Sequence, residues 1–449
     1  MTRRIATHIP QHRGPAAWNV ILGPQPDAEV ADQNQSAEFV IIGAGFAGLA
    51  AARRLTQLAP DSRIIVVDAG RIAEGAAGRN SGFMIDLPHE LTSADYAGAG
   101  DDKVIINLNR HAQAFAADAV DEYQIDPNFF DRSGKVNGAA SQHAHLHNQT
   151  YASHLASLGE TSDMLDAQQM AELTGSQHYL SGLYTPGTVT LQPAGFIRGM
   201  AAGLRRRGVT IFEQTPVTEI RKAAKAAAGW TIETPNAAFT AGKVIMTVNG
   251  HLESFGFEKR RLMQLFLFAV MTKELSADEL RIIGGQPRWG VTPSDPMGTT
   301  MRRIDTGQGG NRIIVRTCAK LRPGMTASAA DIARAEKVMR RKFDQRFPQA
   351  AGLPMQYSWA GHLCLSLNSV AVMRELKTDL FSGCVQNGLG TARGTLTGIG
   401  AAELACGVSS PITSYFAREA EPKKLPPQPF QQIGANSILR FREWRAKDD

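Results

Sequence analysis

The stretch from Phe39 to Leu55 constrains the fold of this chain more than any other. It begins with apolar residues that predict a buried strand, and the run rich in alanine and leucine after Gly45 predicts a helix packed on that strand. Between them the sequence reads Gly-Ala-Gly-Phe-Ala-Gly. Gly43 permits a tight turn and Gly48 permits close packing of helix on strand, so the turn directs free N–H groups at the helix N-terminus outward.

A second apolar strand, Arg63 to Val67, brings the acid Asp68 to its C-terminal end. A carboxylate there accepts hydrogen bonds from the hydroxyls of an adenosine ribose, and its charge repels a 2′-phosphate. A GxGxxG sequence alone is weak evidence, but here strand, glycines, helix, strand and acid follow in the required order. Because Gly45 lets a pyrophosphate approach the backbone, the sequence predicts a bound adenine dinucleotide, and this motif alone leaves an NAD-dependent dehydrogenase open.

Composition limits the remaining classes of protein. A length of 449 residues predicts two or three domains, and the four cysteines are scattered without a CxxC pair, which indicates neither zinc nor disulfides. The net charge of +6 comes from dispersed basic residues, so we expect no nucleic-acid partner. No apolar run reaches the ~18 residues of a membrane span, and the N-terminus lacks an apolar signal core, so we expect a cytoplasmic protein. No ligand set accompanies the histidines of residues 143–154, so we expect no metal.

Some later segments repeat the pattern of strand, glycine loop and helix, and others have strand patterns without such a loop. A helix is predicted from Pro193 to just before Gly208, and Phe381 to Gly407 repeats strand, glycine loop and helix. The intervening segments Leu262–Thr272, Thr299–Ile304 and Arg312–Thr317 have strand patterns. The sequence therefore predicts an α/β fold with a Rossmann-like, discontinuous dinucleotide-binding domain and an inserted, mainly antiparallel-sheet domain.

Several motifs resemble the glycine and D-amino-acid oxidase (DAO) family of FAD-dependent amine oxidoreductases, most closely its γ-glutamylputrescine oxidoreductase branch. They are AAWNVILGPQP at 16–26, GAAGRNSGF at 75–83, LQPAGF at 191–196 and NGLGTARGTLTG at 387–398. The resemblance implies FAD rather than NAD and the following division of the chain. A leader spans 1–37, the FAD-binding domain 38–90, 187–255 and 355–417, the substrate domain 91–186 and 256–354, and a tail 418–449.

The resemblance also implies the cofactor-binding residues, because this sequence matches the family's motifs position by position. The residues that would hold the ADP half are Gly43, Gly45, Phe46, Ala47, Gly48, Asp68 and Ala69. The loop that would run past the pyrophosphate and flavin consists of Gly78, Arg79, Asn80, Ser81, Gly82, Phe83 and Met84, and the backbone of Val217 would read the adenine edge. The residues that would face the pyrimidine side of the flavin are Gly388, Leu389, Gly390 and Thr391.

The chain departs from the family at one informative place. Amino-acid oxidases of this family tend to carry a Gly-Leu-Arg-Pro element whose arginine binds the substrate α-carboxylate, and the corresponding run here is Gly361-His362-Leu363-Cys364. Leu363 cannot bind a carboxylate, which disfavours a free α-amino acid as substrate. Cys364 is displaced from the position where some members attach their flavin, so we expect non-covalent FAD.

The implied reaction is oxidation of a C–N bond in a small primary or secondary amine, by hydride transfer to flavin N5 and hydrolysis of the imine to an aldehyde and an amine or ammonia. His89 and His362 are candidates to accept a proton or a hydrogen bond, and buried structural histidines are the alternative reading.

Four residues are candidates for the substrate pocket. Arg302 and Arg303 alternate on a predicted strand, so one of them is a candidate to hold a remote carboxylate, phosphate or phosphonate, and a surface ion pair is the favoured alternative. Phe266 and Phe268 share one strand face and are candidates for a pocket wall, although core packing explains them equally well.

The electron acceptor is expected to be O2 or a quinone or other electron carrier. Two further functions stay open at this point: oxidative trimming of a modified tRNA base, and a flavin-binding protein without turnover.

Overall fold

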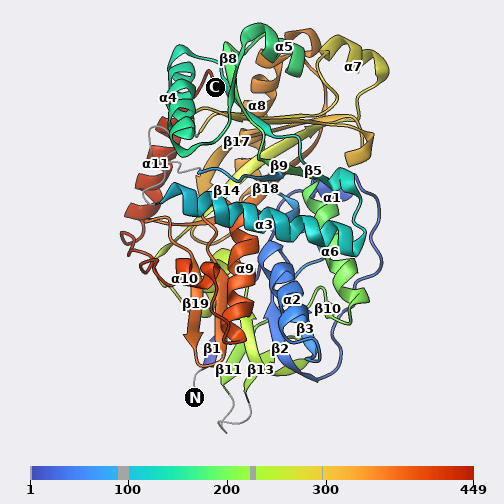
Figure 1. The fold of residues 1–449 in the computed structure, drawn as a ribbon, viewed down its shortest axis with the longest axis vertical. Helices are drawn as coiled ribbons and strands as arrows, with labels where there is room; N and C mark the ends of the chain where they lie inside the picture. The colour runs from blue at the N-terminus through green and yellow to red at the C-terminus, as the bar shows by residue number, and fades with distance from the viewer. Residues whose placement is uncertain (1–2, 89–100, 223–228, 296) are drawn as a thin grey trace.

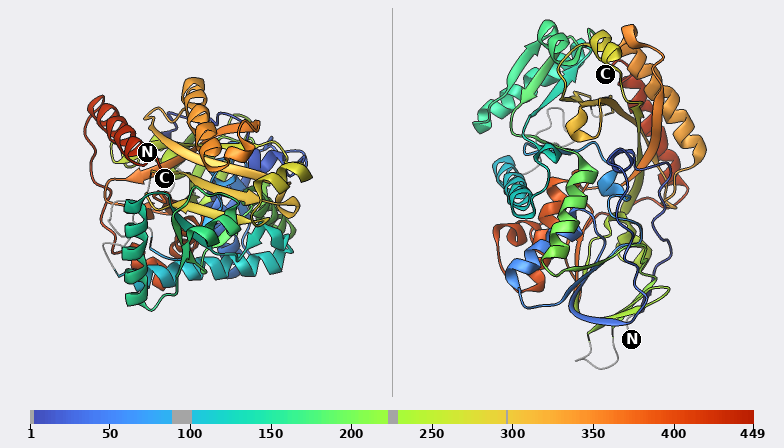
Figure 2. Two further views of the ribbon diagram at one scale, coloured as in Figure 1. Left: turned by 90° about the horizontal axis from the view of Figure 1, so that it is seen from above. Right: turned by 90° about the vertical axis from the view of Figure 1, so that its right-hand side faces the viewer.

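The computed structural model describes residues 3–88, 101–222, 229–295 and 297–449. Figure 1 shows two layered parts stacked along the long axis, and the right-hand view of Figure 2 shows them from the side. The lower part is built on a nine-stranded sheet and the upper part on an eight-stranded sheet. The predicted mixed α/β class is confirmed.

The nine-stranded sheet has the order β1-β11-β12-β13-β2-β3-β10, with β20 paired to β13 and β19 to β20. Its strands β13, β2, β3 and β10 run parallel, as expected of a Rossmann-like sheet. Helices α2 (Phe46–Leu58) and α9 (Ala392–Ala405) share one core cluster with its inner strands. The strands are β1 (Arg3–Ile5), β2 (Gln35–Ile42), β3 (Ile64–Val67), β10 (Thr210–Phe212), β11 (Glu219–Lys222), β12 (Trp230–Glu233), β13 (Ala238–Met246), β19 (Val372–Lys377) and β20 (Leu380–Cys384).

The eight-stranded sheet has the order β18-β14-β17-β16-β15-β6-β8-β7 and is antiparallel except between β15 and β6. One face packs on α8 (Ala329–Arg346) through a separate core cluster. The opposite face shares a core cluster with α2 and α9 through Ala269, Met271 and Ile314, so it is turned toward the nine-stranded part. The strands are β6 (Lys135–Ala139), β7 (Asp163–Asp166), β8 (Ser181–Thr185), β14 (Leu262–Thr272), β15 (Trp289–Pro293), β16 (Thr300–Ile304), β17 (Arg312–Leu321) and β18 (Met355–Ser366).

Sheet pairing differs from the predicted domain boundaries at two places. Residues 355–366 were assigned to the FAD-binding domain, but they form β18, which pairs along β14 and belongs to the eight-stranded sheet. The predicted leader contributes β1, which pairs with β11. Both differences have the same cause, because a strand's hydrogen-bonding partner is set by tertiary packing that local sequence does not record.

The other helices follow their local signals. Helix α3 (Asp102–Tyr123) begins where the Asp101 side chain accepts hydrogen bonds from two backbone N–H groups, and α6 (Pro193–Arg206) has proline at its first position. Helix α6 matches the helix predicted from Pro193. None of the helices in the described ranges is long and apolar enough to cross a membrane. The remaining elements are α1 (Ala17–Val20), α4 (Gln142–Leu158), α5 (Ala167–Thr174), α7 (Ala277–Ile283), α10 (Pro411–Phe416), α11 (Phe430–Arg445) and a small sheet of β4 (Phe83–Met84), β9 (Val189–Leu191) and β5 (Phe130–Asp131).

Candidate active site

The glycine turn between β2 and α2 has the geometry that the sequence predicted. Gly43 has a φ of +107°, and a Cβ on Gly48 would lie 1.8 Å from the Gly43 carbonyl oxygen, so both positions require glycine. Gly45 is the N-cap of α2, and no side chain caps this helix. A Cβ on Gly45 would meet only the Ala77 Cβ, at 3.6 Å. No contact within the protein therefore requires glycine at position 45, and its role toward a pyrophosphate stays a prediction.

Helix α9 begins in a similar way. Thr391 is its N-cap but makes no side-chain cap, and a Cβ on Gly390 would meet nothing within 4 Å. By contrast, a side chain caps each of α3, α4, α5, α6, α7, α8 and α10. The N-termini of α2 and α9 have no side-chain cap, as is also true of α1 and α11, and they lie at the two places where the sequence predicted cofactor contacts.

Asp68 closes the turn from the end of β3. Its Oδ2 accepts a hydrogen bond from the Ala44 N–H at 2.7 Å, and its Oδ1 accepts one from the Gly70 N–H at 2.8 Å. Burial raises the pKa of this carboxyl, and these two hydrogen bonds oppose the rise. Each oxygen keeps a further lone pair, so a role toward a ribose stays a prediction. Val217, the predicted adenine contact, is buried.

The segment Gly78–Met84 is held between the two sheets. The Asn80 side chain shapes it by donating to the Ala77 carbonyl at 2.6 Å and accepting from the Gly82 N–H at 2.8 Å. The Thr391 hydroxyl donates to the Phe83 carbonyl at 2.7 Å, which ties the segment to the start of α9.

Arg79 donates hydrogen bonds to backbone carbonyls around this segment. Its Nε donates to the Glu74 carbonyl at 2.6 Å and its Nη1 to the Ala360 carbonyl at 3.3 Å, and burial lowers the pKa of Arg79 to about 10. The N-terminus of α9, the segment Gly78–Met84 and the edge strand β18 therefore meet at one place.

Arg302 and Arg303 point to opposite faces of β16, as alternation predicted. Arg302 is buried, and its Nη1 donates to the Ser81 carbonyl at 3.0 Å and to the Leu191 carbonyl at 2.6 Å. Arg303 donates to the Gly284 carbonyl on the other side of the sheet. Arg302 thus bonds to the predicted flavin-contacting segment, while Arg303 lies away from it, and both already bind backbone carbonyls.

His362, Phe266 and Phe268 lie on the face of the sheet that is turned away from this segment. Both phenylalanines belong to the core cluster beneath α8, and the rings of Phe266 and His362 are 5.2 Å apart. The His362 Nε2 lies 3.0 Å from Gln264 Oε1, which can only accept, so this nitrogen carries the proton. Burial and two nearby histidines hold the pKa of His362 well below its usual value. His89, the other predicted catalytic histidine, lies outside the described residues.

Of the residues that face the segment Gly78–Met84, the sequence predicted only Leu363, from its match to the substrate-binding arginine of the family. A Cβ on Gly361 would lie 3.3 Å from the Arg79 carbonyl oxygen, so this side of β18 approaches the segment closely. On the same side Leu267, Leu363 and Leu365 are half-buried, whereas their strand neighbours on the other side are buried. Arg316 of β17 is half-buried and pairs with Ala269 on this face. Alternation in 262–272 and 355–366 predicts two faces, but nothing local indicates which face meets the cofactor.

We expect the variant His362→Gln to keep turnover within about threefold of the parent protein, because His362 is buried on the face of the sheet turned away from the segment Gly78–Met84. In the parent protein the pKa of His362 is lower in the folded than in the unfolded chain, so His362 takes up a proton on unfolding. It therefore lowers the free energy of unfolding as pH falls below about 6.5. Glutamine does not titrate, so urea unfolding at pH 8 and pH 5 is expected to show a smaller loss of stability for the variant. A large loss of turnover in His362→Gln at an unchanged free energy of unfolding would instead show that His362 acts in catalysis.

Comparison with known proteins decides the family. Residues 38–405 match the family described as DAO: FAD dependent oxidoreductase. The chain belongs to the DAO family. It is similar to gamma-glutamylputrescine oxidoreductase of Escherichia coli, 22% identical over 355 residues that cover 78% of this chain and 79% of that protein. It is also 22% identical to the probable oxidoreductase OrdL of Haemophilus influenzae, over 82% of this chain and 81% of that protein. The fold matches that of glycine oxidase from Geobacillus kaustophilus with a TM-score of 0.68 and 15% identity, covering 84% and 96% of the two chains.

The cofactor of this DAO-family protein is FAD, and the residues present fit it. The uncapped N-termini of α2 and α9 offer N–H groups to phosphate and to a flavin edge. Thr247 donates to the Gly43 carbonyl of the glycine turn, and two residues later the buried Asn249 Oδ1 has no partner among the described residues. Cys364 is buried, and burial raises its thiol pKa well above the usual value, so the thiolate that a covalent flavin link requires is disfavoured.

Proposed function

We propose that this DAO-family enzyme oxidises the C–N bond of a small primary or secondary amine that carries an acidic group remote from the nitrogen. Bound FAD supplies the acceptor for a hydride from the carbon next to nitrogen, and water then hydrolyses the imine product to an aldehyde and an amine or ammonia. The chain's own residues must bind the amine in its neutral form, aim it and exclude water.

This proposal rests on the apolar side chains of β14 and β18 that face the segment Gly78–Met84. Leu267, Leu363 and Leu365 make that face apolar next to the segment Gly78–Met84. An ionised group loses its hydration against such a wall, so the wall favours a neutral amine over an ammonium and disfavours an α-carboxylate beside the reacting carbon. A free α-amino acid therefore fits this face poorly.

Arg316 is the residue that we propose to bind the remote acidic group of the substrate. It lies on the same face but on β17, two strands away from β18. A strand spacing of about 4.8 Å places the two strands about 10 Å apart. A chain of several carbons between the amine and a carboxylate, phosphate or phosphonate spans that separation.

The variant Arg316→Met tests this arrangement. We expect its KM for an amine bearing a terminal carboxylate to rise at least about tenfold, with little change in kcat and no change for the matching amine without the acid, because a charge-assisted contact is worth about 1.5–3 kcal/mol. Steady-state kinetics on the matched pair of amines measure it, and Arg303→Met, on the opposite face, is the control. Equal losses for both amines would show that Arg316 does not bind the acid.

A further inference from the structure

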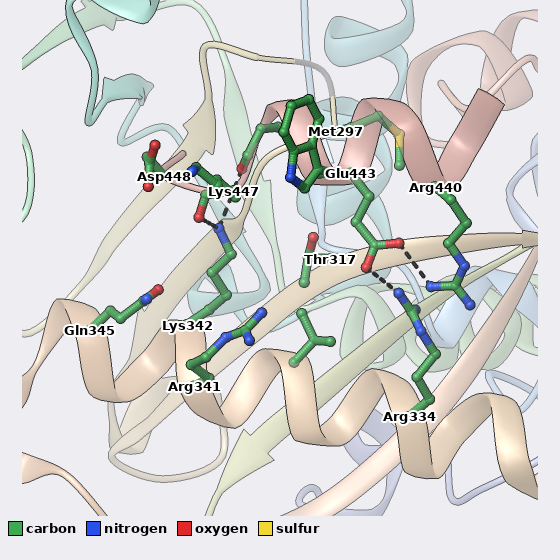
Figure 3. Close-up of a pocket in the computed structure, with 13 residues that line it drawn as sticks. Met297, Thr317, Arg334, Arg341, Lys342, Gln345, Arg440, Glu443, Lys447 and Asp448 are labelled. Atoms are coloured by element: carbon green, nitrogen blue, oxygen red, sulfur yellow. Dashed lines mark hydrogen bonds and ion pairs between the residues drawn. The ribbon is translucent and has the colours of Figure 1, made fainter. Parts of the chain in front are cut away.

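Helix α11 is attached to the protein by its polar face. The Asn436 side chain accepts from the Leu321 N–H at 3.0 Å and donates to the Leu321 carbonyl at 3.3 Å. Glu443 accepts from Arg334 Nη2 of α8 at 2.7 Å and from Arg440 at 3.1 Å, as Figure 3 shows. These contacts fix the rotation of the helix about its own axis.

A pocket of about 480 Å³ lies between α11 and α8. Arg341, Lys342 and Gln345 of α8 and Glu443 of α11 line it, together with the apolar side chains of Met297, Val338 and Trp444 (Figure 3). No residue of α11 is fully buried. The half-buried side of α11 is mostly polar, with Gln432, Asn436 and Glu443 beside Leu439, whereas the usual surface helix turns an apolar stripe inward.

The outer side of α11 is apolar. Five of its large apolar side chains are 56% to 70% exposed, more than any other large apolar side chain among the described residues. At 3.6 residues per turn they cover an arc of about 140° and a length of about 20 Å. This outer stripe consists of Phe430, Ile433, Ile438, Phe441 and Trp444.

Cations accompany the outer stripe. At 3.6 residues per turn, Arg442 borders one side of the stripe and Arg445 lies within its arc at the C-terminal end, whereas Arg440 is bonded to Glu443 and lines the pocket. The one acidic residue of the helix, Glu443, is turned inward. The exposed surface of α11 therefore presents only apolar, neutral polar and positively charged side chains.

We propose that the outer stripe of α11 binds the surface of a lipid bilayer that contains anionic lipids. An apolar arc with tryptophan and phenylalanine, bordered by arginines, is the composition of a helix that lies in the headgroup region. The arginines extend toward lipid phosphates while the apolar side chains enter the boundary of the acyl chains. The helix lies at the outside of the molecule in Figure 1 and in the left-hand view of Figure 2, so a flat surface can reach it.

Trp444 gives the experiment a direct signal. Of the five tryptophans in the chain, Trp18, Trp230, Trp289 and Trp359 are buried, and Trp444 is 63% exposed. The flavin-loaded full chain is mixed with vesicles of equal parts phosphatidylglycerol and phosphatidylcholine, and with phosphatidylcholine vesicles alone. We expect a blue shift of tryptophan emission and co-sedimentation with the first, and at least about tenfold weaker binding to the second.

Two variants separate the outer stripe from unspecific adsorption. Phe430→Ser/Phe441→Ser keeps Trp444 and every inward contact, and is expected to bind anionic vesicles at least about tenfold more weakly at unchanged flavin content. Ile282→Ser/Leu367→Ser removes two apolar side chains of similar exposure elsewhere and is expected to bind as the parent does. The proposal is overturned if the parent does not bind, if both variants bind equally, or if light scattering shows a dimer that the α11 variant dissociates, because a second copy then covers the stripe.

Discussion

The variant Gly45→Ala is expected to fold normally and to lose most of its FAD. The backbone at this position has a φ of −87°, which alanine adopts without strain, and the new Cβ would be 3.6 Å from the Ala77 Cβ, an ordinary contact. The methyl group would stand in front of the free N–H groups of α2, where the pyrophosphate approaches. We expect affinity to fall about a hundredfold, which corresponds to about 2.7 kcal/mol.

Flavin absorbance relative to protein absorbance measures this, together with reconstitution by added FAD. Gly48→Ala is the contrasting variant, because its Cβ would lie 1.8 Å from the Gly43 carbonyl oxygen and the helix could not pack. It is expected to give insoluble protein. Gly324→Ala, where a Cβ meets nothing within 4 Å, is the neutral control. A Gly45→Ala protein with full FAD content would mean that the pyrophosphate does not lie at this turn.

The variant Arg302→Met is expected to lose about 3 kcal/mol of unfolding free energy and to bind FAD at least about tenfold more weakly, since hydrogen bonds from a charged donor contribute about 1.5–3 kcal/mol each. The buried guanidinium donates to the Ser81 and Leu191 carbonyls and to Gln308 Oε1, and it stacks on Trp18 at 5.1 Å. Methionine leaves these acceptors without a donor. It also removes a buried charge whose desolvation was costly, so the loss is smaller than the sum of the bonds.

Urea unfolding and flavin dissociation measure both effects. Arg302→Lys is expected to recover little, because one ammonium does not reproduce a planar fork that reaches three acceptors. Arg303→Met is the matched control on the opposite face of the same strand, and it is expected to leave FAD affinity unchanged. If Arg302→Met instead binds FAD normally but loses affinity for acid-bearing amines, Arg302 contacts the substrate and not the segment Gly78–Met84.

Local chemistry in the sequence determined the FAD-binding turn. Gly43 and Gly48 are required by steric contacts within a few residues, and Pro193 marks a helix start by its fixed φ, so these features were predicted correctly. The place of β18 could not be predicted in this way, because its partner β14 lies about ninety residues earlier in the chain.

The substrate side was harder to predict for a related reason. Alternation in 262–272 correctly put Phe266 and Phe268 on one face of the strand, but the core beneath α8 takes that face and leaves Leu267 on the open side. Arg302 was one of two candidates for anion binding, and in the structure it donates to two backbone carbonyls that only the folded chain brings to it. Sequence period predicts which residues share a face, whereas tertiary packing decides what that face meets.

The most direct test of the account is anaerobic addition of amines to the purified yellow protein, followed through the flavin absorbance. The panel contains primary and N-methylated amines with a terminal carboxylate, phosphate or phosphonate, the same amines without the acid, and free α-amino acids. The account predicts that an acid-bearing amine bleaches the flavin at the lowest concentration and that α-amino acids do so poorly. If a chemical reductant bleaches the flavin but no amine does, amine oxidation is not the function of this site.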